Sequence, residues 1–318
     1  MARSREVLMS DLENPFLTDG GMETTLIFQE GIELPHFASI TLMQTEQGRE
    51  VLRDYFRSYL KLAETYQTGF VLESVTWRAS ADWESPLGFS ESQLQRLNEQ
   101  SIQLLDELRA EFSDLQYPLL LSGCVGPRGD GYQPGKMMTA DEAENYHRWQ
   151  IQHLVQGQPD LITAMTLSYK EEAIGIARAA QSKDIPVVLS FTLETNGRLP
   201  SGELLPDVIR QVDEATDGYP LYYMINCAHP SHFLHIFEEQ GEWMKRIQGL
   251  RTNASTKSHA ELDESTELDI GDPQQLGRDH LPLMSFLNNM KVLGGCCGTD
   301  LRHVDAIARN CIKKALPS

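Results

Sequence analysis

The chain has 318 residues, of which 41% are hydrophobic and 23% are charged, proportions that are typical of a folded globular protein. Its 27 Lys and Arg against 46 Asp and Glu give a formal net charge of −19, which repels nucleic acid phosphates and anionic membrane surfaces. We therefore expect neither a nucleic acid nor a membrane as a partner.

The cysteine content favours a reducing compartment. Five cysteines are a sparse and odd set for this length, unlike the dense even sets of secreted disulfide scaffolds. The first residues, "MARSREVLMSDLENPF", contain no apolar run of the signal-peptide kind, and no stretch of about 18 apolar residues occurs. These features predict a cytoplasmic protein.

Short apolar, β-branched or aromatic runs alternate with longer amphipathic segments along the whole chain. Eight such runs predict strands, at residues 15–20, 69–76, 118–126, 160–166, 186–192, 221–228, 249–255 and 291–298. The segments between them carry helix signals. Leucines recur at helical spacing over 94–108, Thr139 and Glu142 form a capping-box pattern before a helix to about Gly157, and Asp300 is an N-cap candidate for a last helix.

Eight strand–helix units with near-continuous apolar strands indicate a parallel sheet covered by helices. The count of eight favours a closed (β/α)8 TIM barrel over an open doubly wound sheet. No linker, charge block or repeat marks a boundary, so we expect one domain over residues 1–318. The polar segment 255–273 is too long for an ordinary connection, and its place after the seventh strand predicts a lid or a subunit contact on the active face.

Three cysteines fall at the ends of predicted strands, Cys227 in "MINCAHP" and Cys296 with Cys297 in "GGCCGT". The carboxyl ends of barrel strands form one rim, so the three thiols are expected to converge there. Three thiolates with an exchangeable fourth ligand are typical of a catalytic zinc site. The residues alone leave two alternatives open, which are buried structural cysteines and a redox disulfide between Cys296 and Cys297.

Other residues near this rim have simpler interpretations. His229 is favoured as a loop residue over a fourth metal ligand. Four aromatic residues near strand-to-helix loops are favoured as loop anchors over a surface for a cationic ligand, and these are Trp77, Trp83, Tyr132 and Tyr169.

Four motifs, in order along the chain, resemble those of the zinc-dependent homocysteine S-methyltransferase family: "LTDGGMETTL", "GCVGPRGDGY", "NCAHP" and "GGCCGTD". The resemblance implies a (β/α)8 barrel in which Cys227, Cys296 and Cys297 hold Zn²⁺ and the thiol of homocysteine takes the open position. The methyl group would come from a sulfonium or ammonium donor, S-methylmethionine, S-adenosylmethionine or betaine, and methionine would be the product. The partners would be this small-molecule thiol acceptor and the donor, and a homo-oligomer is left open.

The resemblance also implies a set of substrate-binding residues. Asp19, Gly20 and Gly21 would hold the amino acid part of the acceptor, because glycines let the chain approach a carboxylate and Asp19 can accept from an ammonium. Thr76 at the end of the second strand, Asn226 beside Cys227 and Asn253 at the end of the seventh strand would add polar contacts.

One position departs from the family pattern. Met165 stands where the family motif "ETxxxxxEA" has the glutamate that binds the substrate ammonium, and a thioether cannot replace a carboxylate there. Three interpretations follow. In the first, another carboxylate replaces the glutamate: Glu194, which we include in the substrate set, or Glu73 or Glu23. In the second, the acceptor is a different thiol or a selenol. In the third, the barrel binds zinc without catalysis.

Overall fold

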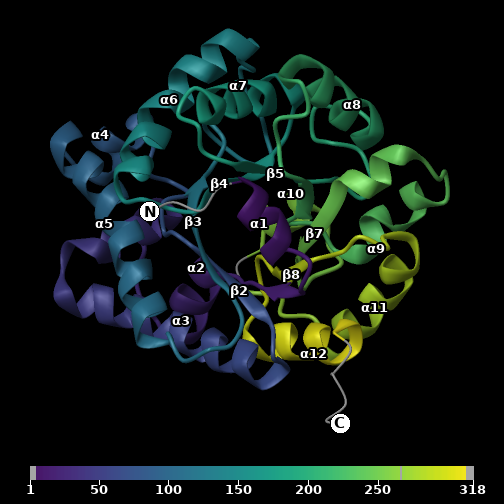
Figure 1. The fold of residues 1–318 in the computed structure, drawn as a ribbon, viewed down its shortest axis with the longest axis horizontal. Coiled ribbons are helices and arrows are strands. Elements are labelled where there is room, and N and C mark those ends of the chain that lie inside the picture. Colours follow the sequence, from purple (N-terminus) through teal and green to yellow (C-terminus); the bar gives the residue numbers. More distant parts are fainter. Residues whose placement is uncertain (1–4, 266, 313–318) are drawn as a thin grey trace.

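The protein is a closed barrel of eight parallel strands in the order β1 to β8, with β1 also paired to β8, in a computed structural model that describes residues 5–265 and 267–312 (Figure 1). The strands are β1 (Phe16–Leu17), β2 (Gly69–Glu73), β3 (Leu119–Val125), β4 (Leu161–Leu167), β5 (Val187–Phe191), β6 (Tyr223–Asn226), β7 (Ile247–Thr252) and β8 (Val292–Gly295). The predicted TIM barrel and its eight strands are confirmed. The first strand is shorter than predicted, because only two of its residues pair with both neighbours.

Helices form a ring around the barrel (Figure 1). The longer ones are α3 (Glu46–Tyr66), α5 (Glu91–Glu111), α6 (Ala140–Gln156), α7 (Lys170–Gln181), α8 (Leu205–Thr216), α11 (Pro273–Phe286) and α12 (Leu301–Cys311). Shorter helices are α1 (Arg5–Asp11), α2 (Met22–Thr24), α4 (Glu84–Leu87), α9 (Pro230–Phe233) and α10 (His259–Asp263). Among the described residues, no helix has the length and apolar character that a membrane crossing requires.

The helix starts that the sequence predicted are present. Thr139 caps α6 and exchanges hydrogen bonds with Glu142 in a capping box. Asp300 caps α12, where His303 supplies the second half of the box. These local signals work because a cap needs only residues one turn apart.

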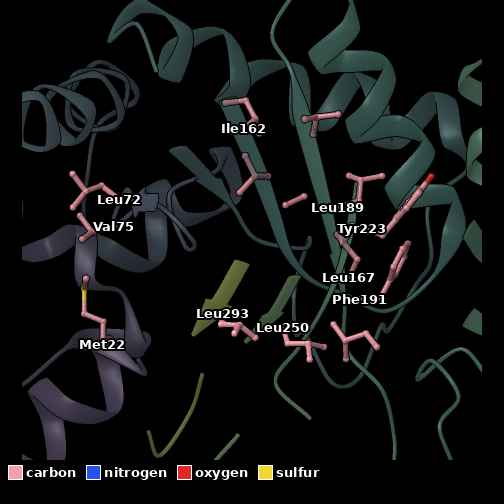
Figure 2. Packing of buried hydrophobic residues seen from close by; sticks show 14 of the residues in the cluster. Met22, Leu72, Val75, Ile162, Leu167, Leu189, Phe191, Tyr223, Leu250 and Leu293 are labelled. Atoms are coloured by element: carbon pink, nitrogen blue, oxygen red, sulfur yellow. The ribbon is translucent and has the colours of Figure 1, made fainter. Parts of the chain in front are cut away.

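The apolar core has two layers. The larger one lies between the strands and the helix ring, and Figure 2 shows part of it, including Leu72, Leu189 and Leu250. The smaller one fills the barrel at the amino-terminal ends of the strands, where Leu8 and Leu12 at α1 complete it. One end of the barrel is therefore closed by side chains, and α1 crosses that end in Figure 1.

Alternation along the strands positions polar groups above this inner layer. In β2, Val71 belongs to the inner layer, and Glu73, two residues on, points to the same side. In β4, Leu161, Thr163 and Met165 also follow one another at every second residue, so they point to the same side; Leu161 belongs to the inner layer and Met165 lines the cavity described below. The inside of the barrel thus changes from apolar to polar toward the carboxyl ends of the strands.

Candidate functional site

A cavity of about 480 Å³ opens at the carboxyl ends of the strands. Residues from β2, β3, β4, β6, β7 and from the segments after β1 and β8 line it. The predicted lid segment contributes Ser255, Leu262, Ser265 and residues 267–269 to the wall. The segment therefore forms part of the cavity wall and contains the short helix α10, and its role as a lid or a subunit contact stays a prediction.

The three predicted metal ligands meet at this cavity. The sulfur atoms of Cys227, Cys296 and Cys297 all lie within 4.8 Å of one another. The structure joins Cys227 and Cys296 in a disulfide, with their Cα atoms 5.3 Å apart, and leaves Cys297 free. The redox alternative was a disulfide between the neighbours Cys296 and Cys297. The structure corrects this pairing, because its disulfide joins the residues that directly follow β6 and β8.

The donor set fits a thiophilic metal. When reduced, the cluster offers three cysteine sulfurs from two loops, which are ligands that structural and catalytic zinc sites use. Burial raises the pKa of the Cys297 thiol, so this group favours its protonated form in the absence of a cation. Cys124, which also lines the cavity, is a free buried thiol outside the cluster.

The peptide around Cys227 is held by side chains. Cys227 has a φ of 53°, a left-handed conformation that non-glycine residues seldom adopt. Asn226 accepts hydrogen bonds from the Thr166 amide (2.9 Å) and the Ser190 hydroxyl (2.6 Å). The Cys227 carbonyl in turn contacts the Asn253 amide (3.1 Å) and His259 Nε2 (2.7 Å). These contacts fix the direction of the Cys227 side chain.

The paired glycines allow the segments after β1 and β8 to approach each other. A Cβ on Gly21 would lie 2.5 Å from the Cys296 carbonyl oxygen, and one on Gly294 would overlap the Thr18 hydroxyl. The Gly21 amide donates to the Thr299 carbonyl (2.9 Å). The structure therefore gives Gly21 a packing role beside the cysteines, while Gly20 and Gly21 both line the cavity.

Asp19 lies at the floor of the cavity and has an internal partner. Its Oδ1 accepts a hydrogen bond from Arg251 of β7 (2.6 Å), and its Oδ2 accepts one from Tyr55 (3.1 Å). Both charged side chains are buried. Burial raises the pKa of Asp19, and the Arg251 charge opposes that rise. An ammonium group would thus have to compete with Arg251 for Asp19.

Sequence reasoning missed Arg251. The signal was an arginine in the middle of the apolar run "GLRTNAS", a position where a charge requires a buried partner. It also missed His259, which stacks on Tyr132 (ring centroids 3.9 Å apart) and contacts the Cys227 carbonyl. Both are long-range contacts that no local motif encodes.

The three candidate carboxylates occupy different places. Glu23 and Glu73 line the cavity, whereas Glu194 does not and contacts His259 Nδ1 (3.2 Å) outside the lining. Burial raises the pKa of Glu73 to about 7, and its Oε2 has no hydrogen-bond partner in the described part of the chain. Burial also raises the pKa of Glu23, whose Oε1 accepts a hydrogen bond from Ser39 (2.8 Å).

Several predicted residues lie outside the cavity lining. Thr76 turns away from it and donates to the Cys124 carbonyl (2.6 Å), which ties the loop after β2 to β3. Asn253 holds the Cys227 carbonyl instead. His229 caps α9, and burial lowers its pKa to about 4. It is not part of the cysteine cluster among the described residues, which agrees with its interpretation as a loop residue.

The upper wall combines aromatic rings with acidic groups. Tyr132 and Trp77 line the cavity, whereas Trp83 and Tyr169 do not, and the Tyr132 hydroxyl lies 3.7 Å from Cys297 Sγ. The described lining residues include two arginines, Arg78 and Arg251, and six acidic residues, Asp19, Glu23, Glu73, Asp130, Glu267 and Asp269. The Arg78 guanidinium lies 5.0 Å from the Trp77 ring and 4.7 Å from the Trp83 ring.

Comparisons with known proteins agree with this geometry. The family model described as homocysteine S-methyltransferase matches residues 16–311. Homocysteine S-methyltransferase 4 of Zea mays is 26% identical, covering 92% of this chain and 88% of the relative. Homocysteine S-methyltransferase YbgG of Bacillus subtilis is 24% identical, covering 91% and 92%.

Solved structures of the Escherichia coli homocysteine methyltransferase MmuM share the fold. The metallated form has a TM-score of 0.71 at 21% identity, and the oxidised form has a TM-score of 0.74 at 20% identity. Each covers 96% of this chain and 99% of the other. Since the family model matches nearly the whole barrel, the chain belongs to the homocysteine S-methyltransferase family of methyltransferases.

Proposed function

We propose that the protein transfers a methyl group from a sulfonium or ammonium donor to the sulfur of homocysteine, giving methionine, with zinc held by Cys227, Cys296 and Cys297. The observation that carries this proposal is the meeting of three cysteine sulfurs at the cavity of a family barrel. When bound, zinc supplies a Lewis-acid centre that holds the acceptor sulfur as a thiolate.

The residues of the chain contribute position and exclusion of water. Asn226, Asn253 and His259 hold the peptide around Cys227, so the ligand sulfurs are oriented before substrate binds. Tyr132 closes the cavity above Cys297, and the segment around Leu262 and Leu268 covers it. A thiolate held at the cysteines would thereby be kept away from bulk water.

The charge of the cavity supports a cationic donor. The lining holds six acidic residues and two arginines, and with Asp19 paired to Arg251 the remaining acidic groups, when ionised, attract a positive charge. Aromatic faces of Trp77 and Tyr132 add a surface on which a sulfonium or quaternary ammonium can rest. S-methylmethionine, S-adenosylmethionine and betaine all carry such a centre, and they are the donors to screen.

The test combines metal content with methylation of homocysteine. The reduced wild-type protein is expected to bind about one zinc per chain and to form methionine with at least one of the three donors. Cys297→Ser should lose zinc and activity, whereas Cys311→Ser, at a free cysteine that ends α12 and is not a member of the cluster, should retain both.

Two outcomes would contradict the proposal. Zinc-loaded protein that methylates a different thiol or a selenol, but not homocysteine, would change the acceptor, an outcome that Met165 makes worth testing. Zinc binding without turnover of any acceptor would indicate a non-catalytic barrel.

A further inference from the structure

The cavity lacks the carboxylate that the family motif places on the fourth strand. Met165 occupies that position and lines the cavity. The other expected acceptor of an ammonium, Asp19, is paired with Arg251 (2.6 Å) and Tyr55. A homocysteine bound with its sulfur at the cysteines therefore needs another anionic group for its ammonium, because a buried ammonium without a partner is costly.

Glu23 is built into the wall directly beside the cysteines. It lies on α2, which is fixed to the segment after β8 at two points. The Gly298 amide donates to Thr24 Oγ1 (3.1 Å), and the Gly21 amide donates to the Thr299 carbonyl (2.9 Å). The same short helix thus carries Glu23 and packs on the turn that carries Cys296 and Cys297.

The Glu23 carboxylate is oriented by a hydrogen bond and interacts with the charge of Arg78 in the same cavity wall. Ser39 donates one hydrogen bond to Oε1 (2.8 Å), which fixes the side chain in the cavity wall. Among the described residues, Glu23 forms no ion pair. Burial raises its pKa, and a cation placed against it would restore the ionised form.

The other two carboxylates fit this role less well. Glu194 contacts His259 and lies outside the lining. Glu73 lies on β2, two residues above the apolar inner layer, and its side chain is 6% exposed. Although its Oε2 has no hydrogen-bond partner among the described residues, Glu73 already interacts with the Ser122 and Thr163 hydroxyls and with the Arg251 charge.

We propose that Glu23 binds the ammonium group of the acceptor and thereby replaces the carboxylate that is absent at Met165. The inference rests on the proposed function, since it assumes an acceptor whose sulfur occupies the cysteine site. It makes Glu23 a specificity-determining residue: acceptors that carry an amino group are selected, and Ser39 orients the carboxylate that selects them.

The experiment compares three thiols on the zinc-loaded enzyme. They are homocysteine, 4-sulfanylbutanoate, which lacks the ammonium, and 3-aminopropanethiol, which lacks the carboxylate. The variants are Glu23→Gln and Glu73→Gln, which make the same chemical change at two carboxylates of one cavity, together with Ser39→Ala. Zinc content and KM for the donor are measured for each.

The wild type should prefer homocysteine over 4-sulfanylbutanoate by about 10- to 100-fold in kcat/KM, the range of one charge-assisted hydrogen bond. Glu23→Gln should remove most of this preference through KM for homocysteine and 3-aminopropanethiol, with zinc content unchanged. Ser39→Ala should reduce the preference for homocysteine in part, and Glu73→Gln should retain this preference.

Three results would overturn the inference: an undiminished preference in Glu23→Gln, a loss of preference in Glu73→Gln instead, or a change in Glu23→Gln confined to KM for the donor. If the wild type methylates neither homocysteine nor its analogues, the proposed function itself fails, and this inference fails with it. A wild type that methylates homocysteine and 4-sulfanylbutanoate equally well leaves the function standing and refutes the role of Glu23 alone.

Discussion

Met165 offers a direct way to move the ammonium-binding charge from one element to another. In the Glu23→Gln background, Met165→Glu places a carboxylate on β4 at the position where the family motif has one. We expect KM for homocysteine to fall at least about 10-fold relative to Glu23→Gln, because an anionic partner for the ammonium is restored. KM for 4-sulfanylbutanoate should not fall. An equal fall for both thiols would show a general effect on the cavity and would contradict the exchange.

Glu73 should make stability depend on pH. Its pKa is raised from an ordinary 4.5 to about 7, chiefly by burial, and the titratable groups that face it are Arg251, Asp19, Cys124 and Tyr222. With a folded-state pKa above the unfolded value, the stabilising contribution of the protonated form is complete below pH 4.5 and is lost as pH rises through 7.

Glu73→Gln mimics the protonated form at every pH. It should therefore be more stable than the wild type at pH 8, by at most about 3 kcal/mol, and the difference should vanish only below about pH 4. Urea unfolding at the two pH values measures this. A variant that is less stable at both would show that the carboxylate is needed to balance Arg251.

At the scale of elements, one ring stack links two loops over the cavity. His259 of α10 stacks on Tyr132 and also contacts the Cys227 carbonyl and Glu194. His259→Ala should increase amide hydrogen exchange in residues 129–135, because the loop after β3 loses the ring on which Tyr132 stacks. It should also raise KM for the thiol acceptor. His259→Phe retains a ring without the polar contacts, so its loop should stay near wild-type protection. Equal exchange in both variants would contradict a role for stacking.

The elements themselves were largely readable from the sequence. Strands such as 118–126 and 160–166 are apolar on both faces, and the caps at Thr139 and Asp300 need only local contacts. The three cysteines could be placed because they end strands of one barrel rim. The direction of Thr76 could not be predicted, because a side chain just past a strand end no longer follows the strand's alternation. Arg251 was missed because its partner is 232 residues away in sequence.

For the molecule as a whole, the Asp19–Arg251 pair joins β7 to the segment after β1 inside the barrel. Arg251→Met should destabilise the fold by about 3–5 kcal/mol, because it leaves the Asp19 carboxylate buried without its cation. The double variant Asp19→Asn with Arg251→Met should recover most of that loss. Chemical unfolding of the wild type, the two single variants and the double variant measures it, and additive losses in the double variant would show that the two residues act independently.

The shortest strand of the barrel is also the one that leads into the cavity. Phe16 and Leu17 of β1 pair in register with both neighbours, backbone hydrogen bonds to β8 continue through Thr18 and Asp19, and Gly20 and Gly21 follow at once. We expect this short strand to open early when the protein is warmed, and that opening would remove one wall of the site. On heating, the protein should become inactive several degrees before its helical circular dichroism changes. Resistance to heat would then be improved most by tightening this one closure, and little by further packing in the helix ring.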